Sequence, residues 1–132
     1  MRSASRALYI VGRIFNIVAM VFSVLTVVVG ILFISLKGQI ADAAATDAIK
    51  ALDDPKEVEI LGIIILVSAL VHLIVTIVIF ILATNASKKI KEGSAEVAPH
   101  VVMLIIGIFG DFFYFLGGIF GLVAVKDNSV AK

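Results

Sequence analysis

Three continuous apolar stretches constrain this chain more than any other feature. They run from about residue 7 to 36, from 59 to 83 and from 98 to 125. A helix needs about 20 apolar residues to cross a hydrocarbon core of roughly 30 Å, so each stretch is long enough to span a bilayer. A membrane β-strand would alternate apolar and polar residues, and these stretches do not. The pattern predicts an all-α integral membrane bundle with three long transmembrane helices, in a single transmembrane domain over residues 1–132.

Composition excludes several other classes of protein. Of the 132 residues, 61% are hydrophobic and 16% are charged, against about 45–50% and about 25% in a soluble domain. A water-soluble fold of this size could not bury so much apolar surface. The chain has no cysteine, which excludes disulfides, zinc–thiolate sites and cysteine nucleophiles. The first stretch exceeds the apolar core of about 7–15 residues in a cleaved signal peptide, so we expect it to remain as a span.

The distribution of charge predicts the orientation. The segment from Lys37 to Glu59 holds three bases and six acids, whereas six bases lie at the start of the first stretch and just after the second. The positive-inside rule then predicts a cytoplasmic amino terminus, an extracellular loop over 37–58 and a cytoplasmic loop over 84–97. Four of these bases are expected to contact lipid headgroups: Arg13, Lys88, Lys89 and Lys91.

The position of the carboxyl terminus depends on the third stretch. If that stretch is one helix, three crossings leave the carboxyl terminus outside. A hairpin at Gly110 and Asp111 is the alternative, with four helical segments of which the last two are short. That hairpin would return the carboxyl terminus to the cytoplasm.

The acidic outer loop has a helical pattern of its own. Ile40, Ala44, Ala48 and Leu52 recur every four residues among strong helix formers. This spacing predicts a short amphipathic outer helix. The helix would either extend the first span or lie on the outer headgroups, and the alternative is a docking face for a partner.

Capping residues predict where the other helices begin and end. Asp54 can cap a helix with Pro55 in its first turn, so the second helix is expected to start before the membrane does. Gly93 is a suitable stop for that helix. Pro99 opens the third helix, and the adjacent His100 is expected to be an interfacial residue without a special role.

Each apolar stretch also carries a stripe of small or polar residues at alternating steps of three and four. Lipid gives apolar side chains no reason to leave it, so membrane helices associate through close backbone approach and interhelical hydrogen bonds. These stripes are expected to form the seams of the bundle, within one chain or with neighbouring chains. The residues expected to pack are Gly12, Ala19, Thr26, Gly30, Gly62, Ala69, Thr76, Gly107, Gly117, Gly118 and Gly121.

Asp111 is the one acid deep inside a stretch, where a charge costs about 2.5–3.5 kcal/mol on insertion scales. His72 lies near the middle of the second stretch, at a similar depth. We predict an intramembrane polar pair between Asp111 and His72, with Ser23, Tyr114 and Asn16 as neighbours. The pair would be a structural link that fixes the register of the bundle, a proton or cation site, or a contact with a second protein.

The sequence lacks the motifs of common enzymes. It has no phosphate-binding GxxxxGK[ST] loop, no HExxH and no GxSxG. Two histidines without cysteine make no convincing metal cluster, so neither a metal nor a cofactor is expected. The short basic patch near residue 90 is explained by topology and anionic lipid, so no nucleic-acid partner is expected.

The layout resembles that of small uncharacterised membrane proteins of Gram-positive bacteria, which are grouped as a domain of unknown function. The shared features are an amino-terminal span, an acidic alanine-containing outer loop, a span that ends in a lysine-rich turn, and the glycine-rich end FYFLGGIFGLVAVK over residues 113–126. The resemblance covers most of the chain. It implies a helical membrane protein with four spans, whereas the last apolar block here is short for two, and it implies no catalytic residues.

Three hypotheses about function follow. The first is a non-enzymatic accessory or assembly subunit that packs its helices within a homo-oligomer or against a larger membrane-protein partner. The second is a transporter or channel component that uses Asp111 and His72 as a proton or ion site. The third is a holin-like pore former. All three place the chain in the lipid bilayer of the cell membrane.

Overall fold

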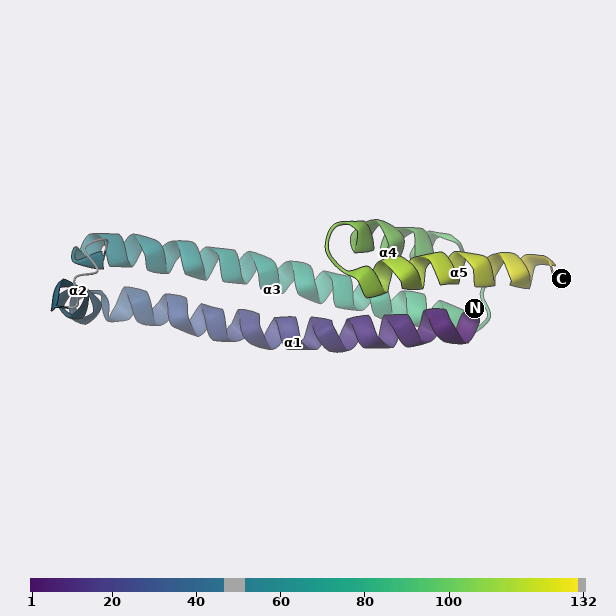
Figure 1. The fold of residues 1–132 in the computed structure, drawn as a ribbon, viewed down its shortest axis with the longest axis horizontal. Coiled ribbons are helices and arrows are strands. Elements are labelled where there is room, and N and C mark those ends of the chain that lie inside the picture. The colour runs from purple at the N-terminus through teal and green to yellow at the C-terminus, as the bar shows by residue number, and fades with distance from the viewer. Residues whose placement is uncertain (47–51, 131–132) are drawn as a thin grey trace. The chain divides into compact units, whose positions relative to one another are not determined.

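The computed structural model describes residues 1–46 and 52–130, and the described residues are helical almost throughout. Their helices, in chain order, are α1 (Arg2–Ser35), α2 (Lys37–Thr46), α3 (Pro55–Lys91), α4 (Ala98–Ile108) and α5 (Phe112–Val130) (Figure 1). The predicted all-α class is therefore confirmed. The outer helix predicted from residue 40 onward corresponds to α2, and Ala48 in its pattern lies outside the described residues.

Helices α1 and α3 are each long and apolar enough to cross a membrane. They contain 34 and 37 residues, which corresponds to about 51 and 56 Å at 1.5 Å per residue. The most apolar 18-residue window of each has a mean hydropathy of 3.0 or 3.1, and only 11% of either window is buried. Such exposed apolar surface is typical of helices that face lipid rather than water.

The third apolar stretch is not one helix, so the structure has the alternative hairpin at Gly110 and Asp111 in place of the predicted long span over 98–125. The stretch forms α4 and α5, which pack against each other and are joined by a turn at residues 109–111 (Figure 1). The cause is local. The Oδ1 atom of Asp111 accepts hydrogen bonds from the backbone N–H groups of Phe113 (3.0 Å) and Tyr114 (3.4 Å). An aspartate that accepts these N–H groups caps the first turn of a helix and so favours a new helix that starts at Phe112.

Both predicted ends of α3 are confirmed. Asp54 precedes its first residue, and the Oδ1 atom of Asp54 accepts the N–H of Lys56 at 2.9 Å. At the other end Gly93 has a φ of 69°, a left-handed conformation that glycine adopts without strain. The N–H of Ser94 then bonds back to the carbonyl of Lys89 at 3.0 Å, which closes the last turn.

The predicted single domain divides into two compact units. Unit 1 comprises Met1–Val18 and Thr76–Lys132, and unit 2 comprises Ala19–Val75. Unit 1 therefore contains the start of α1, the end of α3 and both short helices. Its core includes Tyr9, Met103 and Tyr114, and the start of α1 and the end of α5 lie at the same end of it (Figure 1).

Unit 2 contains the remainder of α1, all of α2 and the first part of α3. Ala41 and Ala44 of α2 are buried, as expected for the apolar face of an amphipathic helix. Lys37 at the start of α2 forms an ion pair of 2.5 Å with Glu59 of α3. The short helix is thus held by both apolar burial and a charge pair.

Candidate functional site

Polar side chains of α1 and α3 meet at a groove in unit 2. The Oγ atom of Ser23 lies 2.6 Å from Nδ1 of His72 and 2.9 Å from the carbonyl oxygen of Ala19. The predicted proximity of Ser23 and His72 is therefore present in the structure. We call this feature the His72 groove; it has a volume of about 260 Å³ and is lined by Phe22, Ser23, Thr26, Ser68, Ala69 and His72.

The His72 groove faces outward. Ser23 and Ala69 are buried, whereas Thr26, Ser68 and His72 are exposed. Thr26 was expected in the seam, but its hydroxyl donates to the carbonyl of Phe22 within its own helix at 2.8 Å. Polar side chains that face hydrocarbon are costly and mark functional positions in membrane helices. The groove is therefore a candidate contact site.

In the His72 groove, the Nε2 atom of His72 can act as either a donor or an acceptor of a hydrogen bond. The Ser23 hydroxyl has one proton and two neighbouring acceptors, the Ala19 carbonyl and Nδ1 of His72. If it donates to Ala19, the ring carries its proton on Nδ1 and Nε2 is an acceptor; if it donates to Nδ1, Nε2 carries the proton and is a donor. Neutral His72 can therefore change from donor to acceptor without a change in charge.

The bond of His72 to Ser23 and the bonds of Asp111 lie in different units, so the pair between Asp111 and His72 stays a prediction. His72 belongs to unit 2 and bonds Ser23, whereas Asp111 belongs to unit 1 and caps α5. Asp111 is half-buried at the turn rather than inside a continuous helix. The prediction was made by comparing depths along unbroken helices, and the turn at Asp111 invalidates that comparison.

A hydrogen-bonded chain inside unit 1 uses two of the predicted neighbours. The hydroxyl of Tyr114 donates to Oδ1 of Asn16 at 2.8 Å, and Nδ2 of Asn16 donates to the carbonyl of Thr76 at 2.9 Å. All three residues are buried. Hydrogen bonds between buried groups in an apolar setting link α1, α3 and α5 within this unit.

A second buried cluster in unit 1 was missed by sequence reasoning. His100 of α4 is fully buried, its Nδ1 lies 2.8 Å from the Tyr9 hydroxyl, and the two rings stack with centroids 5.8 Å apart. The hydroxyl of Ser5 donates to the carbonyl of Gly117 at 2.8 Å. A Cβ atom at Gly121 would lie 2.5 Å from the imidazole, so that glycine leaves room for the ring. His100 is therefore a packed core residue and not the interfacial residue that was expected.

The glycines of the predicted seams all lie at close contacts within their own unit. A Cβ atom at any of them would come within 3.0 Å of a neighbouring side chain or backbone atom, so each allows two helices to approach closely. Ala69 and Thr76 are buried as well, and Ala19 is partly buried. The glycines in close contact are Gly12, Gly30, Gly62, Gly107, Gly117, Gly118 and Gly121.

The four bases expected at lipid headgroups have different surroundings. The guanidinium of Arg13 lies over the ring of Phe80, with Cζ 5.6 Å from the centroid, which is a cation–π geometry. Lys88 and Lys91 are exposed. Lys89 forms a hydrogen-bonded ion pair of 2.6 Å with Glu96, and that hydrogen bond raises the pKa of Lys89 above its ordinary value.

No described residues form a cluster of three or more His, Cys, Asp or Glu that could hold a metal ion.

The chain matches no family model, no curated protein and no solved structure. The resemblance to the Gram-positive membrane proteins therefore stays a prediction.

Proposed function

We propose that this chain is a non-enzymatic integral membrane protein that acts as an accessory or assembly subunit. It would bind a second copy of itself or a larger membrane protein through the His72 groove. The observation that carries the proposal is the outward exposure of Ser68 and His72 within the apolar length of α3. A transmembrane segment of a partner could cover these side chains and hydrogen-bond to them, at about 0.6–2 kcal/mol for each bond.

The packing of the stripe glycines within each unit supports the same proposal. The glycines of the sequence stripes already pack against neighbours within their own unit. A partner would therefore have to use a different surface, and the His72 groove combines small, polar and aromatic side chains at one place. A proton or ion pathway through Asp111 and His72 has less support, because each residue has its own partners in a different unit.

The proposed topology follows from the charges and from the hairpin. The basic residues at the start of α1 and at the end of α3 would lie in the cytoplasm, and the acidic segment between α1 and α3 would lie outside. Because the start of α1 and the end of α5 lie at the same end of unit 1, both chain termini would be cytoplasmic. This revises the outside carboxyl terminus that a single third span would give.

Photo-crosslinking in the native membrane tests the proposal. A photoreactive amino acid at Ser68 would lie in the His72 groove. The matched control is Ile74 of the same helix, which is 62% exposed and turned roughly 120° from Ser68 and roughly 160° from His72 at 100° per residue. We expect an adduct of defined mass from position 68 and none from position 74. The adduct should be lost in a chain that carries both the probe at position 68 and the substitution His72→Leu.

The mass of the adduct separates the two kinds of partner. Twice the mass of the chain indicates a homo-oligomer, and a larger mass indicates a membrane complex. Equal yields from positions 68 and 74, or no adduct from either, would remove the proposal. An adduct that survives His72→Leu would show that the histidine is not part of the contact.

A further inference from the structure

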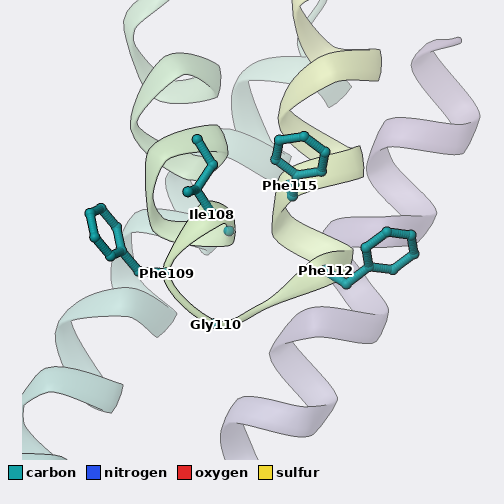
Figure 2. Close-up of a pocket in the computed structure, with 6 residues that line it drawn as sticks. Ile108, Phe109, Gly110, Phe112 and Phe115 are labelled. Carbon is teal, nitrogen blue, oxygen red and sulfur yellow. The ribbon is translucent and has the colours of Figure 1, made fainter.

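The turn between α4 and α5 presents large apolar side chains outward. Ile108 is 62% exposed, Phe109 is 86% exposed and Phe112 is 65% exposed. Figure 2 shows Phe109 and Phe112 pointing in opposite directions away from the turn, beside an open pocket of about 510 Å³ that Phe115 also lines. Exposure of this much aromatic and aliphatic surface to water is unfavourable, so the turn requires apolar surroundings.

The backbone of the turn is suited to such surroundings. The N–H groups of Phe109, Gly110 and Asp111 donate to carbonyls in the last turn of α4. Two of the N–H groups at the start of α5 donate to the carboxylate of Asp111. Irregular backbone is tolerated in hydrocarbon only where its polar groups find partners within the protein. The half-buried carboxylate is in turn favoured by the positive end of the α5 dipole.

The helical lengths that lead to the turn match half the thickness of a bilayer. With 11 residues, α4 is about 16 Å long at 1.5 Å per residue. The tip lies beside Phe15 of α1, because the rings of Phe15 and Phe113 stack with centroids 5.2 Å apart. Phe15 is about 14 Å along α1 from Arg6 at that same rise. Both lengths are close to half of a hydrocarbon core of roughly 30 Å.

We propose that the α4–α5 hairpin enters a single leaflet, on the basic side of the membrane, and that acyl chains of that leaflet cover Ile108, Phe109 and Phe112. Both arms start and finish near the same basic end of unit 1, so the hairpin returns without crossing. This inference does not depend on whether the His72 groove binds a partner. The exposed bases near that end are Arg2, Arg6, Lys88, Lys91 and Lys126.

Fluorescence depth measurements test the insertion. The chain contains no tryptophan, so Phe109→Trp introduces a single probe at the tip, and Phe112→Trp is a second variant in case the first fails to fold. The matched control is Val97→Trp at the open end of α4, where Val97 is 49% exposed. The full chain is reconstituted in vesicles of phosphatidylcholine and phosphatidylglycerol that carry bromine on the acyl chains.

We expect blue-shifted emission and several-fold stronger quenching by the brominated lipid at position 109 than at position 97. Aqueous iodide should show the opposite order. Iodide quenching at position 109 equal to that at position 97 would place the tip in water and overturn the proposal. The absence of quenching by both agents would show that protein covers the tip, and would also overturn it.

Cysteine labelling in intact cells tests the restriction to one leaflet. The chain has no native cysteine, so Phe109→Cys, Ser94→Cys and Gly38→Cys are each unique. With a membrane-impermeant maleimide added outside, we expect labelling at position 38 but not at 94 or 109; in inverted vesicles position 94 should label and position 109 should not. Labelling of position 109 from outside would mean that the hairpin crosses the membrane.

Discussion

Unit 1 and unit 2 are built from the same two long helices, yet they place their polar side chains differently. In unit 1, Tyr9, Asn16 and His100 are buried and hydrogen-bonded to groups on other helices. In unit 2, Ser68 and His72 lie on an exposed groove. The difference follows from the number of helical segments, because α4 and α5 cover polar groups in unit 1, whereas no residue described in unit 2 covers the groove.

The two units thus differ in whether their polar groups stabilise the fold or are available to bind a second chain. Polar groups that have partners inside the chain contribute to its fold, and their removal leaves a buried donor or acceptor without a partner. Exposed polar groups within the apolar part of a helix contribute less to the isolated chain than buried ones do, even where one atom has a partner, as Nδ1 of His72 has in Ser23. They are instead positions where a second chain gains hydrogen bonds on binding.

The largest expected effect in unit 1 is that of Gly107→Ala. The new Cβ would lie 2.2 Å from the backbone nitrogen of Phe115, and backbone atoms cannot move away as a flexible side chain does. We expect a loss of about 1–3 kcal/mol in the free energy of unfolding, measured by SDS titration in mixed micelles. The control is Gly110→Ala, whose Cβ meets no atom within 4 Å. Equal losses for both variants would contradict the close packing of α4 on α5.

A smaller loss is expected for Tyr114→Phe. The change removes the hydroxyl that donates to Asn16, and it leaves the buried Oδ1 atom of Asn16 without that partner. An unsatisfied buried acceptor costs about 1–3 kcal/mol, and we expect the lower part of this range because the ring keeps its packing. The double variant Tyr114→Phe with Asn16→Leu should lose less than the sum of the two single changes. Additive losses would show that the two side chains do not interact.

Two substitutions of Asp111 in unit 1 test whether its carboxylate is a helix cap or an ion site. Asp111→Ala should reduce the free energy of unfolding by about 1 kcal/mol, the usual value for a helix N-cap. Asp111→Asn keeps an oxygen that can accept the N–H groups of Phe113 and Tyr114, so it should restore most of the loss. An asparagine variant as damaged as the alanine variant would argue for a role of the charge itself.

The smallest effect is expected for the surface ion pair between Lys89 and Glu96. The hydrogen bond from Glu96 raises the pKa of Lys89, so any stabilisation is complete below about pH 10 and is lost as the pH rises through the raised pKa. Since the pair is partly exposed, Lys89→Gln should change unfolding at neutral pH by little more than the error of the measurement. The residual effect should disappear in high salt. A loss as large as that of Gly107→Ala would mean that the loop after α3 is structurally essential.

The long helices and their ends could be predicted from the sequence because their causes are local. Continuous apolar residues predict α1 and α3, and Asp54 with Pro55 and Gly93 mark the ends of α3. The proximity of Ser23 and His72 could also be predicted, since counting residues gives their depth along two unbroken helices. Close contacts at the glycines followed from the spacing of small residues.

The hairpin was predicted only as the alternative to a single third helix, and the burial of His100 was not predicted. The physical reasons differ. Asp111 was interpreted first as a charge within a span, although an aspartate directly after Gly110 also fits a helix N-cap, which favours the hairpin over the single helix. The burial of His100 has no local cause. It depends on the hydroxyl of Tyr9 and on the space left by Gly121, which lie on other helices.

The claim that unit 1 stabilises the fold and the His72 groove binds a partner is tested by comparing His72→Leu with Tyr114→Phe. Two quantities are measured for each variant: the free energy of unfolding in micelles, and the crosslinking yield from the probe at Ser68 in the native membrane. Because Ser23 keeps the Ala19 carbonyl as an acceptor, His72→Leu should change unfolding by less than about 0.5 kcal/mol and should abolish the crosslink. Tyr114→Phe should lower the free energy of unfolding and keep the crosslink. The account would be contradicted by the reverse result: His72→Leu lowers the free energy of unfolding and keeps the crosslink, whereas Tyr114→Phe leaves the free energy of unfolding unchanged and loses the crosslink.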